Sequence, residues 1–354
     1  MVRGFLCAAL VALMGVAGND RALAQTMPTT TAAASADPIA DFYTGKTVNI
    51  IVGSEPGGTY DLYGRTLARH LGKYLPGKPA VIVQNMTGAG SYLAARRVVS
   101  IAAQDGLTLG ALGAALPYQQ LYDPASPPLD IARINWIGST AAYHMFMLVR
   151  GDSPVRTIAD LRIHETVQST IAPGQSNSII VAVVREALGA RIKAINGHKS
   201  MNDAMFALQR GEINGYPSAP EEALRRIYGK QLSDGDIRLI LQFGPEPLKA
   251  YPDVPWAQAL AANEDDRNLI DLATGFLKTG YVYMMGPDVP KERVVAMRKA
   301  FMAALGDPEL LAEAKQQTLN IAPIDGGSVA QMLDKAYAMP SAVIARMRRI
   351  FVAQ

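Results

Sequence analysis

A glycine-rich segment near the start of the chain has the composition of an anion-binding loop. Residues 53–61 read GSEPGGTYD and follow the apolar run TVNIIV at 47–52. The spacing from Gly53 to Gly58 matches the first half of a phosphate-binding P-loop, but Thr59 and Tyr60 replace its Lys-Ser/Thr pair. Without that lysine a nucleotide is a poor ligand, whereas a strand that leads through a glycine-rich turn into a helix N-terminus still suits an anion. The segment therefore predicts a site for a small carboxylate.

Within this segment we expect backbone N–H groups to hold the carboxylate, directly or through water. The candidate ligand-binding residues are Pro56, Gly57, Gly58, Thr59 and Asp61. Asp61 would repel a bare anion, so we assign it to organising the loop. A tight turn that Asp61 merely caps is the alternative interpretation.

A second loop, NMTGAGS at 85–91, resembles the first in its content of small residues. Gly88 and Gly90 permit close approach of the backbone to a ligand, and Ser91 can cap the helix that follows. Thr87, Ala89 and Gly90 are candidates for the wall of the site. A purely structural turn is an equally good interpretation.

Polar residues also precede predicted helices in the second half of the chain. Ser176, Asn177 and Ser178 stand before the apolar run IIVAVVREAL, where one should cap the helix and the others can donate to a ligand carboxylate. Lys199 lies near a helix start, where the helix dipole disfavours a cation, so a bound anion would explain it. An ordinary surface lysine is the alternative.

Histidine spacing and the usual catalytic motifs give no support to an enzyme or a metal site. No two of the four histidines have metal-ligand spacing; His144, in an apolar run, either lines the site or is a core residue. The chain lacks G-x-S-x-G, S-x-x-K and H-E-x-x-H motifs. We therefore predict a binding protein without cofactor or metal; a secreted α/β hydrolase and a metal receptor using some of the 14 tyrosines are the alternatives.

The elements that must position these residues alternate between strand and helix. Apolar runs are expected as strands at 48–52, 80–84, 108–113, 167–172, 191–195, 213–217 and 237–243, with helices near 59–74, 90–102, 176–188 and 203–209. Four helices are expected in the tail at 291–351, punctuated by proline and glycine. This alternation is typical of βαβ units in an α/β fold with a mostly parallel sheet, and the length suggests two domains.

The N-terminal segment predicts export. An early arginine, an apolar stretch and Ala22-Leu23-Ala24 form a secretory signal peptide over 1–24, cleaved near Ala24. Residues 25–38 are small and polar, typical of a flexible tether. The only cysteine, Cys7, lies in the signal, so the mature chain should contain no thiol. Removing Arg3, Arg21 and Asp20 from 34 basic and 31 acidic residues leaves 32 and 30, a charge near +2, which argues against nucleic acid as a partner.

Several motifs together resemble one family, the extracytoplasmic solute receptors of tripartite tricarboxylate transporters, also called Bug proteins. The resemblance lies in FYTGKTVNIIVGSEPGGTYDLYGRTLARHL, VIVQNMTGAGSYLAA, AQDGLTLG and SPVRTIADL, and extends more loosely to the C-terminus. It implies a two-lobed periplasmic binding protein of the Venus flytrap type, with two crossover strands and a ligand cleft between the lobes. It also implies a di-, tri- or aromatic carboxylic acid as ligand, a membrane permease as partner and a soluble periplasmic protein, which we expect to be a monomer.

On this resemblance we expect the first lobe to comprise 39–142 and 277–354, and the second 143–276. The sequence departs from the family in the second lobe. A glycine- and serine-rich loop is replaced by APGQSNSII at 172–180, and a Pro-Tyr-Lys-Gly segment by Gly197-His198-Lys199-Ser200. The position of the tyrosine thus becomes His198, a further candidate for the site.

Overall fold

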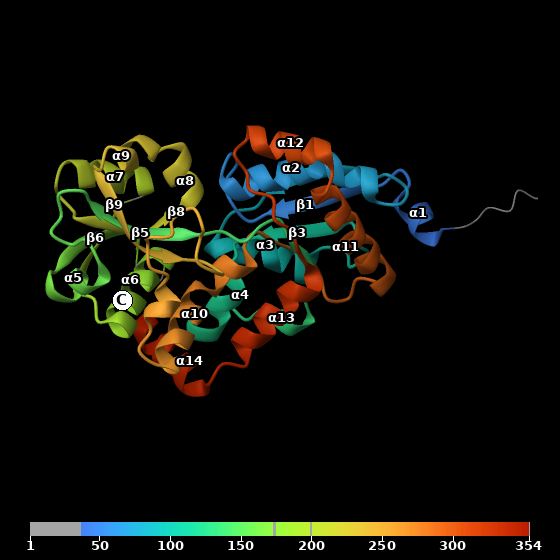
Figure 1. The fold of residues 1–354 in the computed structure, drawn as a ribbon. Coiled ribbons are helices and arrows are strands. Elements are labelled where there is room, and N and C mark those ends of the chain that lie inside the picture. Colours follow the sequence, from blue (N-terminus) through green and yellow to red (C-terminus); the bar gives the residue numbers. More distant parts are fainter. Residues whose placement is uncertain (1–36, 173–174, 199, 354) are drawn as a thin grey trace, which may run out of the picture. The chain divides into compact units, whose positions relative to one another are not determined.

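Two β-sheets organise the chain (Figure 1). The computed structural model describes residues 37–172, 175–198 and 200–353. The first sheet has the strand order β11-β4-β10-β3-β1-β2, in which β1 runs parallel to β2 and β3, while β10 is antiparallel to β3 and β4. Its strands are β1 (Thr47–Val52), β2 (Ala80–Asn85), β3 (Thr108–Leu112), β4 (Asn135–Ser139), β10 (Val282–Met285) and β11 (Ile324–Asp325).

The second sheet has the order β7-β6-β8-β5-β9. Its strands are β5 (Met145–Arg150), β6 (Thr166–Thr170), β7 (Ile192–Asn196), β8 (Gly215–Pro220) and β9 (Ile237–Phe243). Strand β6 is parallel to β7 and β8, whereas β5 is antiparallel to β8 and β9. The chain passes to this sheet between β4 and β5 and returns between β9 and β10, as the predicted two-lobed α/β fold requires.

Helices connect and cover these strands. They are α1 (Pro38–Tyr43), α2 (Thr59–Tyr74), α3 (Tyr92–Arg96), α4 (Leu116–Tyr122), α5 (Ile158–Ile163), α6 (Ser176–Leu188), α7 (Met201–Gln209), α8 (Glu221–Arg226), α9 (Gly229–Ser233), α10 (Glu264–Thr279), α11 (Lys291–Leu305), α12 (Pro308–Gln316), α13 (Gly326–Tyr337) and α14 (Ser341–Val352). Short irregular helices span Ala89–Ser91, Arg97–Ile101, Ile131–Arg133 and Ala257–Leu260. Among the described residues, no helix is both long and apolar enough to cross a membrane.

Most predicted elements are confirmed. Helices α2 and α6 and strand β9 have the expected bounds, and the tail contains the four expected helices, α11 to α14. The expected helix at 90–102 is instead three short helical segments: positive φ at Ala89, Gly90 and Ser91 separates the first from α3, and α3 continues into a π-helical turn at Arg97–Ile101. The predicted tether is wrong in its last two residues: Asp37 caps α1 by accepting from the Ile39 N–H at 3.0 Å, and Pro38 is its first residue.

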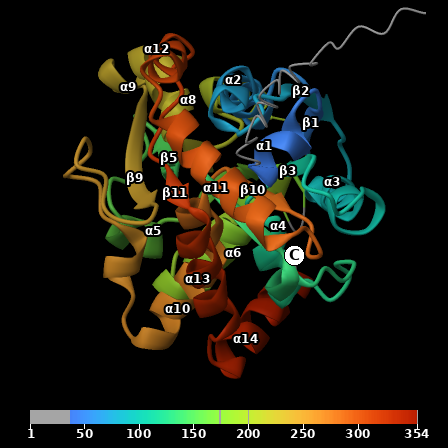
Figure 2. The same cartoon turned by 90° about the vertical axis from the view of Figure 1, so that its right-hand side faces the viewer.

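Residues 37–354 form one compact unit, and helices α10 and α14 join its two sheets. Helix α14 lies beside α10 in both views (Figures 1 and 2), and one hydrophobic cluster includes Leu112 from β3, Ile180 from α6, Leu272 from α10 and Met347 from α14. The C-terminal tail therefore contacts elements of both predicted lobes. The residue boundaries of those lobes stay a prediction.

Candidate functional site

A cavity of about 620 Å³ is lined by the N-termini of both α2 and α6. Its wall is formed by Gly58, Thr59, Met145, Ile171, Gln175, Ser176, Asn177, Ser200, Met201, Asn202, Tyr216, Ser218, Pro220, Ala223, Ile227 and Tyr228. Two of these residues follow β1 of the first sheet, and the others belong to elements around the second sheet. The volume is within the range of small-molecule sites.

On the first side of the cavity, α2 presents an uncapped N-terminus. Gly58 is its N-cap residue, with an extended backbone (φ −72°, ψ 167°) and no side-chain hydrogen bond to the first turn. The first N–H groups of a helix have no intrahelical partner, and they carry the positive end of the helix dipole. Because Gly58 and Thr59 line the cavity, these donors are available to an anion there.

Asp61 holds this loop in place and is almost fully buried. Its carboxylate accepts from the Gly57 N–H at 2.8 Å, from Arg65 Nε at 2.9 Å and from Asn85 Nδ2 at 2.8 Å. Burial by itself would raise the pKa of Asp61, but the bonds from Arg65, Gly57 and Asn85 outweigh it and hold the pKa below its usual value. The ionised Asp61 carboxylate is therefore stabilised by hydrogen bonds from the protein itself.

On the second side, α6 also begins without a side-chain cap. Its N-cap, Gln175, has an extended backbone and makes no capping bond, whereas in α7 the Ser200 hydroxyl accepts from the Asp203 N–H at 3.2 Å. Asn177 is 2% exposed, and its Oδ1 accepts from the Ser178 N–H at 2.9 Å. Among the described residues its Nδ2 makes no hydrogen bond of good geometry, although the Asn177 amide lies close enough to the Tyr216 hydroxyl to lower the pKa of that group against the effect of burial. A buried donor without an acceptor is costly, so a ligand oxygen would satisfy it.

The remainder of the wall combines apolar side chains with the polar groups of Ser200, Asn202, Tyr216, Ser218 and Tyr228. Met201 from α7, Pro220 from β8 and Ala223 from α8 contribute to it, together with Met145, Ile171 and Ile227. The Tyr228 hydroxyl donates to Asn202 Oδ1, and burial raises the pKa of both Tyr216 and Tyr228, which keeps their hydroxyls neutral. The cavity thus combines donors at two helix N-termini with a wall of apolar and uncharged polar side chains.

The structure brings four predicted site residues together in this cavity: Gly58, Thr59, Ser176 and Asn177. The wall does not include Pro56, Gly57, Asp61, Thr87, Ala89, Gly90, His144, Ser178 or His198. Lys199 lies outside the described residues. The assignment of these residues to a ligand site stays a prediction.

Two of the residues outside the wall, Ser178 and His144, form hydrogen bonds within the protein. The Ser178 hydroxyl donates to the carbonyl oxygens of Ala172 and Gln175, both at 2.9 Å, so it closes the loop before α6. His144 Nε2 lies 2.9 Å from the Glu246 carbonyl oxygen, and the ring packs on the loop that follows β9.

The loop after β2 is hydrogen-bonded to the glycine-rich loop that follows β1. The Ser91 hydroxyl donates to the Gly53 carbonyl at 2.8 Å and accepts from the Gly113 N–H at 2.9 Å. The same hydroxyl therefore joins the carboxyl ends of β1 and β3, where open α/β sheets place their ligand loops. Ala89 and Ser91 have φ values of 46° and 77°, so this loop is strained to make these contacts.

Sequence reasoning missed the apolar wall. Tyr216 and Ser218 follow one another on alternate positions of β8, and Ala223 and Ile227 are four residues apart on either side of the end of α8. The sequence pattern that could have predicted this wall is the pair of polar residues near the end of β8, followed by the apolar Ala223 and Ile227 at helical spacing. It is weak because α8 has only six residues and no glycine-rich loop precedes it.

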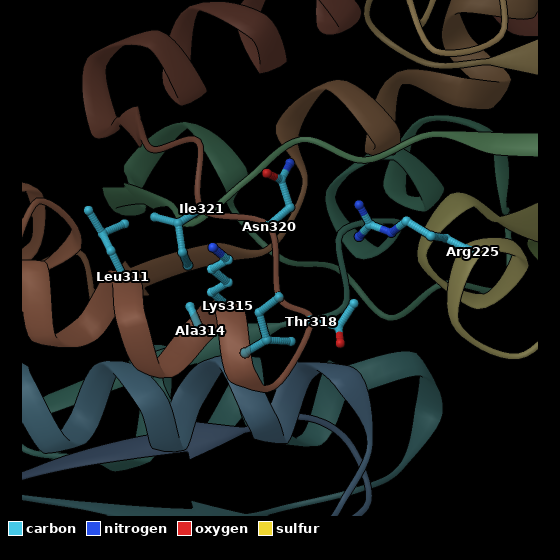
Figure 3. A pocket seen from close by; sticks show the side chains of 8 residues that line it. Arg225, Leu311, Ala314, Lys315, Thr318, Asn320 and Ile321 are labelled. Atoms are coloured by element: carbon cyan, nitrogen blue, oxygen red, sulfur yellow. The ribbon is translucent and has the colours of Figure 1, made fainter.

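A second hollow of about 400 Å³ lies between α8 and the segment after α12 (Figure 3). Arg225 extends from α8 toward Asn320, and Lys315 and Leu311 line the hollow from α12. None of the predicted site residues takes part in it. The described residues also include a group of His70, Asp307 and Glu309 with metal-ligand proximity, but Lys73 bonds to both carboxylates and supplies the positive charge there.

Two α/β sheets joined by crossovers, with a cavity between their loops, define the class of two-lobed periplasmic binding proteins. The chain belongs to the family described as "Tripartite tricarboxylate transporter family receptor", whose sequence model matches residues 64–347. This is a family of solute receptors and not of enzymes.

Individual relatives are distant in sequence. The chain is 26% identical over 285 residues to the "UPF0065 protein in gbd 5'region" of Cupriavidus necator, which covers 78% of this chain and 80% of the relative. A TctC solute-binding protein from Polaromonas superposes with a TM-score of 0.68 at 17% identity, over 88% of this chain and all of the other. MatC from Rhodopseudomonas palustris, solved with bound malate, gives 0.58 at 17% identity, over 86% and 99%. These likenesses establish the fold.

Proposed function

We propose that this protein is a periplasmic receptor that binds one small carboxylic acid in the cavity between α2 and α6 and delivers it to the membrane permease of a tripartite transporter. The observation that supports the proposal most is that two uncapped helix N-termini line one cavity beside the buried amide of Asn177. Neutral donors of this kind hold an anion without a paired cation. The malate bound in the MatC structure is consistent with the proposal.

Binding in such a cavity would drive closure. Gly58 and Thr59 approach the ligand from the first sheet and Ser176 and Asn177 from the second, so only a closed form satisfies the carboxylate fully. The ligand then has a higher affinity for the closed form and shifts the equilibrium toward it. The closed form would present the surface that the permease recognises.

The direct test replaces Asn177 by aspartate, which has nearly the same shape but brings a negative charge to the ligand carboxylate. We expect calorimetry with a panel of mono-, di- and tricarboxylates to show a loss of affinity of more than about tenfold for every acid that the natural protein binds. Gly58→Val should also weaken binding, because its side chain would obstruct the approach to the α2 N-terminus.

Two variants serve as controls. Asn268→Asp makes the same exchange on α10, away from the cavity wall, and His164→Ala removes an exposed ring at the end of α5; both should bind as the natural protein does. Circular dichroism should be unchanged in all four variants. Undiminished affinity in Asn177→Asp and Gly58→Val would remove these helix N-termini from the site.

Export is a separate prediction of this proposal. We expect the signal peptide at 1–24 to be removed near Ala24, which leaves a mature periplasmic chain without cysteine. Mass spectrometry of the protein from the periplasmic fraction measures the mature N-terminus. Exported protein that still begins at Met1 would contradict the cleavage prediction.

A further inference from the structure

We propose that the ligand is a monocarboxylate with a bulky apolar body, such as an alkyl-substituted aromatic acid, and not a polar di- or tricarboxylate. This inference rests on the proposed function and narrows its substrate class. It is carried by the distribution of polar and apolar side chains over the wall of the cavity.

Donors that suit a carboxylate lie at the helix N-termini, and Ser200, Asn202, Tyr216, Ser218 and Tyr228 add polar groups elsewhere on the wall. Thr59, Ser176 and Asn177 offer hydroxyl and amide donors beside the backbone of α2 and α6. One carboxylate has two oxygens with about four acceptor sites, so a single group of this kind satisfies these donors. These donors are therefore matched to one carboxylate.

Two large apolar side chains on the wall are exposed to solvent. Ile171 is 38% exposed and Ile227 is 48% exposed, although both line the cavity. Ala223 and Ile227, four residues apart, line the cavity together, whereas Arg225 on α8 lines the other hollow. An apolar ligand body would remove these isoleucines from water. A ligand chain with hydroxyl or carboxyl groups would bury the same surface less favourably, because its polar groups would lose hydration.

The lack of charged side chains among the described wall residues also favours a monocarboxylate. None of the sixteen wall residues in the described part of the chain is ionisable as a cation or as a carboxylate. A second ligand carboxylate placed against Ile227 and Met201 would lose its hydration without gaining a cationic partner among the described wall residues. The apolar wall therefore selects against a second charge as well as for apolar surface.

An isosteric pair of acids tests the inference. 4-Methylbenzoate and terephthalate share the ring and the first carboxylate, and differ only in a methyl group or a second carboxylate at the far end. We expect calorimetry on the mature protein to show that 4-methylbenzoate binds at least about tenfold more tightly. Hexanoate against adipate repeats the comparison without a ring.

A variant pair locates the effect on the wall. Ile227→Ser should weaken 4-methylbenzoate at least about fivefold and reduce its preference over terephthalate. Ile163→Ser, at an isoleucine that is 65% exposed at the end of α5 and outside the cavity wall, should leave both affinities unchanged. Thermal unfolding in the absence of ligand checks that both variants fold.

The possible outcomes separate this inference from the proposed function. Tighter binding of terephthalate, adipate, malate or citrate than of the apolar monocarboxylates would overturn the inference and leave the receptor function standing. Binding of none of these acids would overturn both. An unchanged affinity in Ile227→Ser would remove the apolar wall from ligand recognition and so would also overturn the inference.

Discussion

At the scale of single residues, Asp61 shows how a receptor loop can contain a carboxylate and still suit an anion. Its carboxylate accepts hydrogen bonds from Gly57, Arg65 and Asn85, and the side chain is buried. Arg65 in turn donates to Asn85 Oδ1 at 2.9 Å, so the residues form a closed network. The negative charge is neutralised locally, and the free N–H groups of α2 remain directed to the cavity.

We therefore predict that Asp61→Asn destabilises the protein and weakens carboxylate binding together. The amide retains one acceptor oxygen but loses the charge that Arg65 and the Gly57 N–H stabilise, which should lower the free energy of unfolding by about 1–3 kcal/mol. Urea denaturation measures this loss. Asp41→Asn, at an exposed aspartate of α1, is the control and should change stability little; a similar loss in both variants would contradict the role of Asp61.

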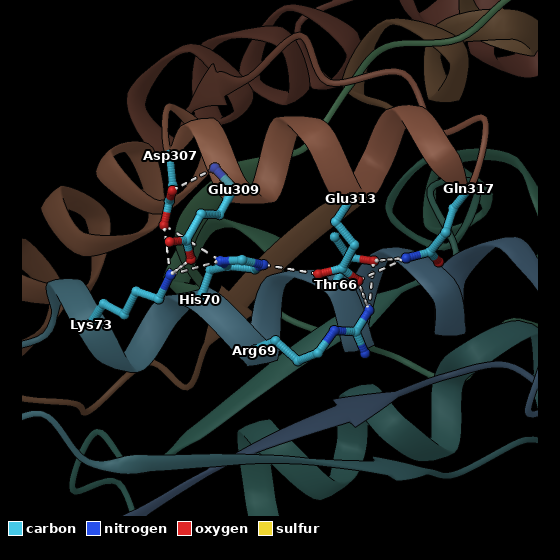
Figure 4. A network of polar contacts seen from close by, with 8 residues as sticks. All are labelled: Thr66, Arg69, His70, Lys73, Asp307, Glu309, Glu313 and Gln317. Atoms are coloured by element: carbon cyan, nitrogen blue, oxygen red, sulfur yellow. Dashed lines mark hydrogen bonds and ion pairs between the residues drawn. The ribbon is translucent and has the colours of Figure 1, made fainter.

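At the scale of elements, a polar network fastens α12 to α2 (Figure 4). His70 Nε2 lies 2.9 Å from Glu313 Oε2, Lys73 donates to Asp307 at 3.2 Å and also bonds to Glu309, and Arg69 bonds to Glu313. The Glu309 backbone N–H is the main cause that lowers the pKa of Asp307 to about 2, and the bond from Arg69 is the main cause that lowers the pKa of Glu313 to about 2. Both carboxyl groups therefore favour folding in their ionised forms.

This network predicts a sensitivity to acid. A lowered pKa in the folded state contributes stability above the ordinary pKa of the group, and that stability is lost as the pH falls toward the folded value. We expect Glu313→Gln to be less stable than the natural protein at neutral pH, with the difference shrinking from about pH 5 to about pH 2.5. Urea denaturation at a series of pH values tests this.

The control for this series is Glu246→Gln, at an exposed glutamate in the loop after β9 that bonds only through its backbone carbonyl. Its stability difference from the natural protein should not depend on pH. If Glu313→Gln showed a difference that stayed constant over the same range, the ionised carboxylate would not be the source of the stability.

Elements with strong local signals could be predicted from the sequence, and the apolar half of the cavity could not. Helix α2 follows a glycine-rich turn and buries Tyr63, Leu67 and Leu71 at helical spacing, so its bounds were predictable. The cavity residues at Gly58 and Asn177 were predictable for the same reason, because each precedes or begins such a helix. Ile171 and Ile227 carry no local signal, since only the approach of β6 and α8 in the folded chain places them on one wall.

At the scale of the whole molecule, helix α14 is hydrogen-bonded to helices that pack near the first sheet and to a helix that packs near the second. Arg346 donates to Asp266 at 2.7 Å on α10 and to Glu186 at 3.0 Å on α6, while Arg348 donates to the Leu121 carbonyl at 3.0 Å on α4. The predicted assignment of 277–354 to the first lobe stays a prediction, and these bonds connect its last helix to α6 of the second lobe as well. If the lobes close on a ligand, contacts that join both lobes would persist only close to the pivot, and we therefore predict a pivot near α10 and α14.

The last prediction concerns this pivot. Arg346→Met keeps the apolar stem of the side chain but removes its bonds to Asp266 and Glu186, which should lower the free energy of unfolding by about 1–3 kcal/mol. Because contacts at a pivot change little between open and closed forms, the affinity for a carboxylate should change by less than about twofold. Denaturation and calorimetry on the same protein measure the two quantities, and Arg133→Met, at an exposed arginine paired with Asp288, is the control that should change neither. A tenfold or larger gain in affinity would mean that the Arg346 bonds oppose closure, and the pivot would then lie elsewhere, between β4 and β5 and before β10.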